Sequence, residues 1–167
     1  MITLKFINLG LICLICFYIG ELKSKYYENR VIELSKFQNS LIMFKSKIEF
    51  TYEPINSIFL DISKIIYEDK SNIFIDTLNN KKDIYLSWNE AVEKQKNNIN
   101  NEDKEIIKML GKLLGKTDIK GQVSQIELTQ KLIEKQIEKA ENEKNKNSRL
   151  YKTMGVICGM AICIILV

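Results

Sequence analysis

The sequence contains no histidine, which removes the side chain that most often serves as general base and metal ligand near neutral pH. Residues 21–153 also contain no cysteine, so this stretch offers neither a disulfide framework nor a thiolate zinc site. A glycine-rich phosphate loop is not expected, because Gly111 and Gly115 fall in a helical pattern. We therefore expect no catalytic, cofactor-binding or metal-binding residue, and a protein that is not an enzyme.

Neither sign of charge dominates, because 25 lysine and arginine residues stand against 21 aspartate and glutamate residues. The two signs are interspersed along the chain, whereas a nucleic-acid-binding protein usually gathers its positive charge into one stripe. We therefore expect no nucleic acid among the partners. The length of 167 residues indicates one domain, with a core inside residues 21–153.

Two segments near the ends of the sequence, residues 6–20 and 154–167, have no charged side chain and are almost entirely apolar. They also hold all four cysteines. With their flanks these segments approach the length that a helix needs to span a bilayer. We expect an N-terminal membrane anchor at 1–20, a helical domain at 21–149 and a C-terminal anchor at 150–167. Lysines and arginines flank the middle domain on both sides, which predicts that it faces the cytoplasm.

The first segment has an alternative interpretation as a cleaved signal peptide, with Lys5 as its basic region. Cleavage requires small residues, and Tyr18 two positions before Gly20 fits poorly, so we favour an uncleaved anchor. Small residues also recur at a spacing of four in both segments, which lets membrane helices approach closely. Either helix packing or chance explains this spacing. The residues concerned are Cys16, Gly20, Gly155, Gly159 and Cys163.

The middle of the chain predicts helices and no strands. An apolar stripe formed by Leu34, Phe37, Leu41, Phe44 and Ile48 predicts a helix from near Tyr27 to just before Thr51. This helix either continues from the N-terminal apolar segment or begins after a short break. The single proline, Pro54, suits the first turn of a second helix. Two short helices follow, one around residues 73–78 and one around residues 84–92.

Two longer helices complete the predicted bundle. Asn100 or Asn101 can cap the first, whose apolar residues continue to Leu113 and Leu114 and which Gly115 can end in a left-handed conformation. Asp118 can cap the second, which we expect from about Ile119 to Arg149, leading as a polar stalk into the C-terminal anchor. Its predicted seam comprises Val123, Ile126, Gln130, Ile133, Ile137 and Ala140.

Residues 101–122 carry a pattern of Glu-Asp, two Leu-Gly pairs, Asp and Gln, and Trp88-Asn-Glu-Ala91 precedes it. In this pattern, and in its order of elements, the chain resembles the stage III sporulation protein AB family. The resemblance implies an all-helical cytoplasmic domain similar to that of the F-type platform proteins of type II secretion. It also implies a place in the export complex between mother cell and forespore, on the mother-cell side of the forespore membrane.

By resemblance, the expected partners are the secretion-type ATPase of that complex and its small membrane proteins. Gly111, Gly115, Asp118 and Gln122 form the family pattern, and we interpret them either as structural caps or as partner contacts. The alternative function is a general type II secretion or type IV pilus platform protein. That class usually carries two such helical domains and more spanning helices than this chain shows.

Overall fold

The computed structural model describes residues 2–68, 71–80, 83–95, 98–112 and 114–166. All regular elements of this part of the chain are helices and none is a strand, which confirms the predicted all-α class. The chain divides into two compact units: a terminal unit of residues 1–31 and 139–167, and a central unit of residues 32–138. The predicted boundaries at residues 20 and 149 concern membrane anchoring and stay a prediction.

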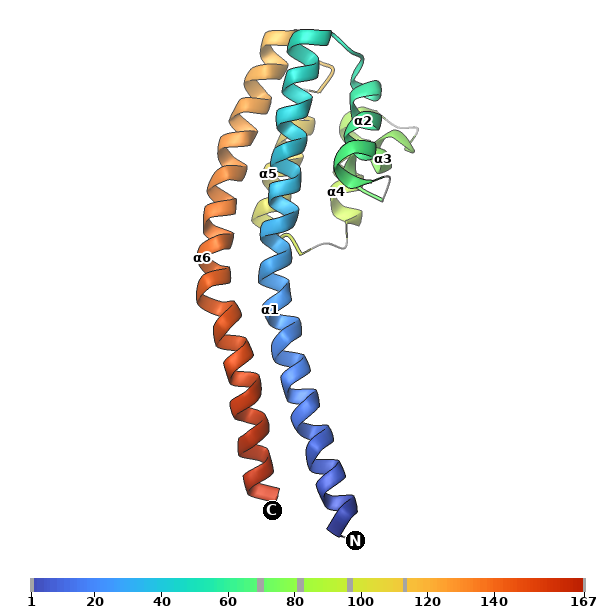
Figure 1. Ribbon diagram of the computed structural model, residues 1–167. Helices are drawn as coiled ribbons and strands as arrows, with labels where there is room; N and C mark the ends of the chain where they lie inside the picture. Colours follow the sequence, from blue (N-terminus) through green and yellow to red (C-terminus); the bar gives the residue numbers. More distant parts are fainter. Residues whose placement is uncertain (1, 69–70, 81–82, 96–97, 113, 167) are drawn as a thin grey trace. The chain divides into compact units, whose positions relative to one another are not determined.

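Helix α1 (Ile2–Ser46) runs without interruption through the expected start near Tyr27, so it continues directly from the first apolar segment (Figure 1). Its residues 32–46 belong to the central unit. The predicted stripe is buried, and each of its side chains exposes 5% of its surface or less. Each buried leucine or phenylalanine contributes about 1.5–3 kcal/mol to folding, so this stripe is a main part of the core.

The end of the first helix differs from the expected simple stop. A π-helix, η1 (Lys47–Thr51), follows α1, and Tyr52 then adopts a φ of 54°, which is uncommon for a residue other than glycine. Lys47 Nζ lies 2.9 Å from Glu53 Oε2 and 2.5 Å from Asp61 Oδ2. These two ion pairs tie the π-helical turn to the helix that follows it.

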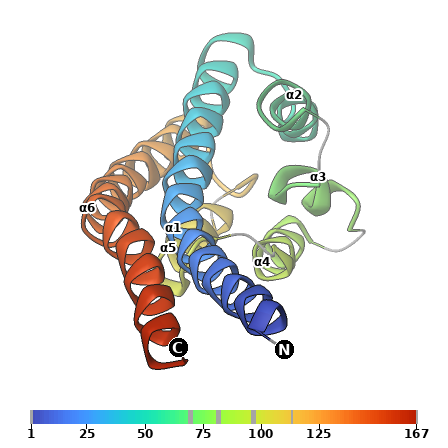
Figure 2. The same cartoon turned by 60° about the horizontal axis from the view of Figure 1, so that its bottom comes forward.

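Three shorter helices follow in the central unit: α2 (Ile55–Tyr67), α3 (Ile73–Leu78) and α4 (Ile84–Lys94). Helix α2 begins directly after Pro54, as predicted. The oxygens of Asn72 and Asp83 accept backbone N–H bonds at the starts of α3 and α4 and so cap them. Helix α3 packs against both α2 and α4, and the three follow one another in Figure 2.

Helix α5 (Asn101–Gly111) starts at the predicted position and ends earlier than predicted. Asn100 is its cap: Asn100 Oδ1 accepts the Asp103 N–H at 2.8 Å, and Asp103 Oδ2 accepts the Asn100 N–H at 2.9 Å. The expected continuation through Leu114 is wrong, because the helix ends at Gly111 and Leu114 lies in the following turn. Leu113 lies outside the described residues.

Helix α6 (Ile119–Leu166) begins as predicted and continues through the polar run 141–147 without a break. Glutamate and lysine are good helix formers, so a polar surface does not end the helix. In the central unit, Ile126 and Ile133 of the predicted seam are buried. Thr129 and Gln136 are buried as well, at positions that the seam analysis did not include.

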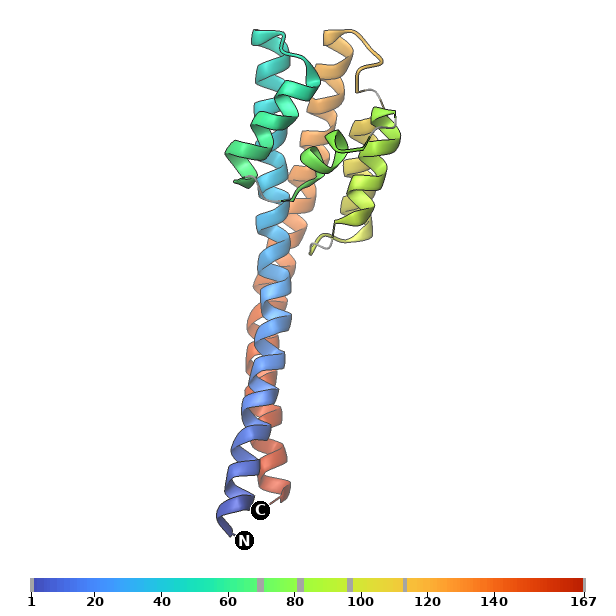
Figure 3. The same cartoon turned by 90° about the vertical axis from the view of Figure 1, so that its right-hand side faces the viewer.

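The terminal unit consists of the start of α1 and the end of α6, which lie side by side (Figures 1 and 3). Contacts join Gly20 to Gly155, Ser24 to Ser148 and Arg30 to Glu143, so the two helices are antiparallel. Across the residues that the structure describes, no helix combines the length and the apolar character needed to cross a membrane.

Candidate functional site

The central unit brings two elements of the sequence pattern into one contact. Trp88 of α4 is fully buried, and its Nε1 donates a hydrogen bond to Ile107 O of α5 at 2.9 Å. Gly111 packs directly against this ring, because a Cβ added there would lie 2.5 Å from Trp88 Cδ1. The glycine is therefore required for the close approach of α4 and α5.

The other three predicted residues build the connection between α5 and α6. Gly115 has a φ of +70°, the left-handed conformation expected for it, although α5 has already ended at Gly111. Asp118 Oδ1 accepts the Gly121 N–H at 3.0 Å, which confirms its predicted role as cap. Gln122 Nε2 donates to Thr117 O at 3.0 Å and holds the turn against the helix.

The triplet Gly115-Lys116-Thr117 is separated from α6 by Asp118 alone, close to the place where a phosphate-binding loop would meet its helix. A helix rather than a strand leads into it. The Asp118 carboxylate already occupies the Gly121 amide, and Lys116 Nζ lies 5.4 Å from the centroid of the Tyr85 ring. These contacts describe a helix–helix turn rather than a phosphate cradle.

The four predicted residues lie at different depths. Gly111 is buried under Trp88, whereas Gly115 and Asp118 are exposed at the turn. All four have a structural role in packing, turning or capping. A partner contact at the exposed turn stays a prediction.

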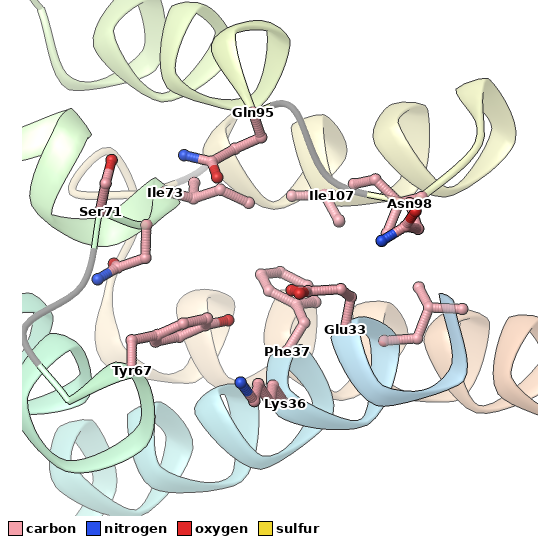
Figure 4. A pocket seen from close by; sticks show the side chains of 12 residues that line it. Glu33, Lys36, Phe37, Tyr67, Ser71, Ile73, Gln95, Asn98 and Ile107 are labelled. Carbon is pink, nitrogen blue, oxygen red and sulfur yellow. The ribbon is translucent and has the colours of Figure 1, made fainter. Parts of the chain in front are cut away.

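A polar cavity of about 270 Å³ lies elsewhere in the central unit (Figure 4). Glu33, Lys36 and Tyr67 contribute side chains to its wall, together with Gln95 and Asn98. Sequence reasoning missed this cavity, because its lining comes from α1, α2, α3, α5 and the segments before α3 and α5, which no local pattern connects.

Tyr67 is the titratable group of this cavity with the clearest shift. Burial raises its pKa to about 12, and the negative charge of Glu33 acts in the same direction, whereas a hydrogen bond with Ser40 opposes it. The hydroxyl therefore stays protonated throughout the physiological pH range. It can donate or accept hydrogen bonds there, but it does not supply a base near neutral pH.

A second, open groove of about 630 Å³ runs between α4 and α5. Lys108 Nζ lies 2.5 Å from Glu93 Oε1 and 2.7 Å from Glu105 Oε1 in its wall. The hydrogen bonds that Lys108 donates to Glu105 and Glu93 raise the pKa of Lys108, and the bond that Glu93 accepts from Lys108 lowers the pKa of Glu93. The groove therefore presents paired charges of both signs, and this pairing favours neither an anionic nor a cationic ligand.

Among the described residues, no group of three or more His, Cys, Asp or Glu side chains could hold a metal ion.

Three of the small residues considered for helix packing, Cys16, Gly20 and Gly155, are in contact in the terminal unit. A Cβ added at Gly20 would lie 2.7 Å from Tyr151 O, and one added at Gly155 would lie 2.9 Å from Cys16 O. Because both obstacles are backbone atoms, neither can move aside. Gly159 is also buried, whereas the side chain of Cys163 lies outside the described residues.

A polar network joins the same two helices farther along. Ser24 Oγ and Ser148 Oγ lie 2.5 Å apart, and both hydrogen-bond to Glu28 Oε1. Burial alone would raise the pKa of Glu28, but the charge of Lys152 and the hydrogen bonds outweigh it, so the pKa is lowered. The carboxylate is therefore ionised at neutral pH.

Among the side chains that the structure describes in the terminal unit, Arg30 is the most buried cation, with 2% of its side chain exposed. Its Nη1 donates a hydrogen bond to Glu143 Oε2 at 2.6 Å. The two residues are 113 positions apart in the sequence. No sequence pattern predicted this ion pair or the serine contact, because both depend on how α1 and α6 pair. Together they fix the register of the antiparallel helices.

Comparison with known proteins finds a matching family and a similar solved structure. The family model of stage III sporulation protein AB matches residues 5–167. A solved structure of a stage III sporulation protein AB superimposes with a TM-score of 0.61 and 17% sequence identity, covering 71% of this chain and 98% of that one. No curated protein matches the sequence significantly. The structural likeness concerns the fold, and the family match covers nearly the whole chain.

Proposed function

Since the chain belongs to the stage III sporulation protein AB family, we propose that it is a non-enzymatic component of the export complex between mother cell and forespore. In this role it is an adaptor or platform for the secretion-type ATPase of the complex and for its small membrane proteins. The family match over residues 5–167 is the observation that carries the proposal.

The proposal includes anchoring in the membrane at both ends, with the central unit in the cytoplasm. Large apolar side chains are exposed on both helices of the terminal unit, where water would be an unfavourable solvent for them. On α1 these are Leu11, Leu14, Ile15, Phe17, Tyr18, Ile19 and Leu22, and on α6 they are Leu150, Met154, Val156, Ile157, Met160, Ile162 and Ile164. Lipid is the solvent that suits this surface best.

Tyrosines next to the apolar ends support the same proposal. The rings of Tyr27 and Tyr151 are stacked with centroids 5.9 Å apart, and Tyr26 meets Tyr27 edge to face at 5.5 Å. Tyrosine is enriched where a membrane meets water, because its ring is apolar and its hydroxyl is polar. Burial and the hydrogen bond with Tyr151 raise the pKa of Tyr27, so this hydroxyl stays neutral.

Two physical properties suit a membrane-anchored helical unit to work with an ATPase. Anchoring at the membrane raises the effective concentration of the central unit for any partner held at the same surface. The buried aromatic cluster around Trp88 gives this unit a close-packed core, and close-packed interiors transmit displacement rather than absorb it. Such a unit can pass a movement of the motor on to other members of the complex.

Anchoring is tested by carbonate extraction of vesicles that hold the full-length chain. We expect it to remain in the membrane fraction, and release into the supernatant would contradict the anchors. Lys23→Cys tests the orientation: an impermeant maleimide added outside intact cells should not label it beyond the wild-type level.

The role in the complex is tested by deleting the gene in a spore-forming host. Sporulation should stop after engulfment while vegetative growth is unchanged, and normal spore yield would exclude the proposal. Vesicles holding the chain should also retain the purified ATPase, and empty vesicles should not. If the chain instead supports pilus or type II secretion and spore yield is normal, the alternative platform function applies.

A further inference from the structure

A shallow groove of about 340 Å³ lies on α6 within the terminal unit. Its lining changes from polar to apolar along the helix: Asn145, Lys146 and Arg149 are followed by Leu150, Thr153 and Met154. Every one of these side chains is exposed. The groove therefore offers a cationic end and an apolar end on one helix face.

The two cations of the groove differ from other cations of the terminal unit. Lys25 is paired with Glu21, Lys152 with Glu28, and Arg30 with Glu143. Lys146 and Arg149 have no acidic partner among the residues that the structure describes. No carboxylate lines the groove, so its cationic end favours an anion.

The apolar end continues along the same face of α6. After Thr153, Val156, Met160 and Ile164 recur at spacings of three and four, and all three are exposed. The distance from Thr153 to Ile164 is about 16 Å at ~1.5 Å per residue, which is close to half of the ~30 Å hydrocarbon core of a bilayer. One leaflet's acyl chain therefore matches the length of this apolar face.

From this arrangement we infer that the groove binds an anionic phospholipid of the membrane, an inference that rests on the anchoring proposed above. Lys146 and Arg149 bind the phosphate, with the guanidinium of Arg149 able to donate two parallel hydrogen bonds to it. The Asn145 amide adds a neutral donor. Thr153 Oγ1 donates to Arg149 O at 3.0 Å, so its hydrogen is not available to the lipid. The acyl chain lies along Val156, Met160 and Ile164.

The proposed orientation suits this ligand. With the central unit in the cytoplasm, the cationic end of the groove meets the cytoplasmic leaflet, where anionic lipids concentrate. A bound lipid would hold α6 at a fixed depth, because headgroup and acyl chain contact different parts of one groove.

Native mass spectrometry tests the inference with the full-length chain in micelles that contain equimolar phosphatidylglycerol and phosphatidylcholine. The wild-type chain should retain phosphatidylglycerol preferentially. The double variant Lys146→Gln with Arg149→Gln should weaken this retention about 25-fold, because each cation near an anionic lipid contributes a factor of about five. The matched control, Lys23→Gln with Lys144→Gln, loses the same charge outside the groove and should retain the lipid like wild type.

Three results would overturn the inference: no preference for phosphatidylglycerol, unchanged retention in the groove variant, or an equal loss in the control. Displacement of the lipid by the same concentration of inorganic phosphate would indicate a free anion as ligand and would also overturn it. Circular dichroism checks that the variants are folded. Carbonate extraction from pure phosphatidylcholine vesicles measures anchoring without the anionic lipid, so failure of the anchor and failure of the groove are distinguishable.

Discussion

Gly111→Ala probes the contact between α4 and α5. The added Cβ would lie 2.5 Å from Trp88 Cδ1 and 2.9 Å from Cγ, which is too close for any real contact. Trp88 cannot move aside freely, because it is fully buried and its Nε1 is bonded to Ile107 O. The ring or helix α5 must therefore shift.

The magnitude follows from three effects. Overpacking a core costs about 1–3 kcal/mol, and a strained or lost Trp88 hydrogen bond adds about 1 kcal/mol. Alanine has a better helix propensity than glycine, which offsets at most ~1 kcal/mol of this loss of unfolding free energy. The net loss of unfolding free energy is about 2 kcal/mol, which lowers the melting temperature of a chain of this size by about 4–8 °C.

Thermal unfolding followed by circular dichroism measures this loss, and the fluorescence of the single tryptophan reports the local shift. Gly10→Ala is the control, because it also replaces a helical glycine but has nothing within 4 Å of the new Cβ. It should leave the melting temperature unchanged or raise it slightly. If Gly111→Ala melts like wild type with unchanged Trp88 emission, the steric reasoning is refuted.

Three further predictions concern other features. Tyr67 has a raised pKa, so below pH 10 both folded and unfolded chains keep its proton. Between pH 10 and 12 only the unfolded chain loses it, and denaturant titrations should show the unfolding free energy falling about 2–3 kcal/mol further in wild type than in Tyr67→Phe. Asn100→Ala removes half of the capping box with Asp103 and should lower the free energy of unfolding by about 1 kcal/mol, whereas an unchanged urea midpoint would contradict this role. Glu143→Gln removes the Glu143 carboxylate from its ion pair with Arg30 and should destabilise the chain by about 1–3 kcal/mol in the same titration, a value reduced because Glu143 is partly exposed. Coinciding curves for variant and wild type would show that the pair is unimportant.

The features predicted correctly from the sequence are those that depend on residues close together in the chain. The stripe from Leu34 to Ile48, the helix after Pro54 and the caps at Asn100 and Asp118 each depend on residues within a few positions of one another. The predicted end of α5 was wrong for the opposite reason. An apolar pattern continues to Leu114, but whether those residues stay helical depends on packing against other helices, which local spacing does not describe.

The candidate site was predicted less well than the fold. The predicted glycines and Asp118 have clear structural roles, but the polar cavity beside Tyr67 and the network around Glu28 were missed. Both collect side chains from segments far apart in the sequence. Buried polar residues such as Ser24 and Arg30 look like ordinary surface positions until the partner helix is known.

The separation of 113 residues between Arg30 and Glu143 has a consequence during synthesis. A ribosome adds about 5–20 residues per second, so Arg30 is made about 6–23 s before its partner exists. For that interval the first helix is without the second, and its apolar start has no helix to cover it. The apolar start of α1 must therefore be accommodated elsewhere first, and the helical pair can close only after the second half of the terminal unit, residues 139–167, has been made.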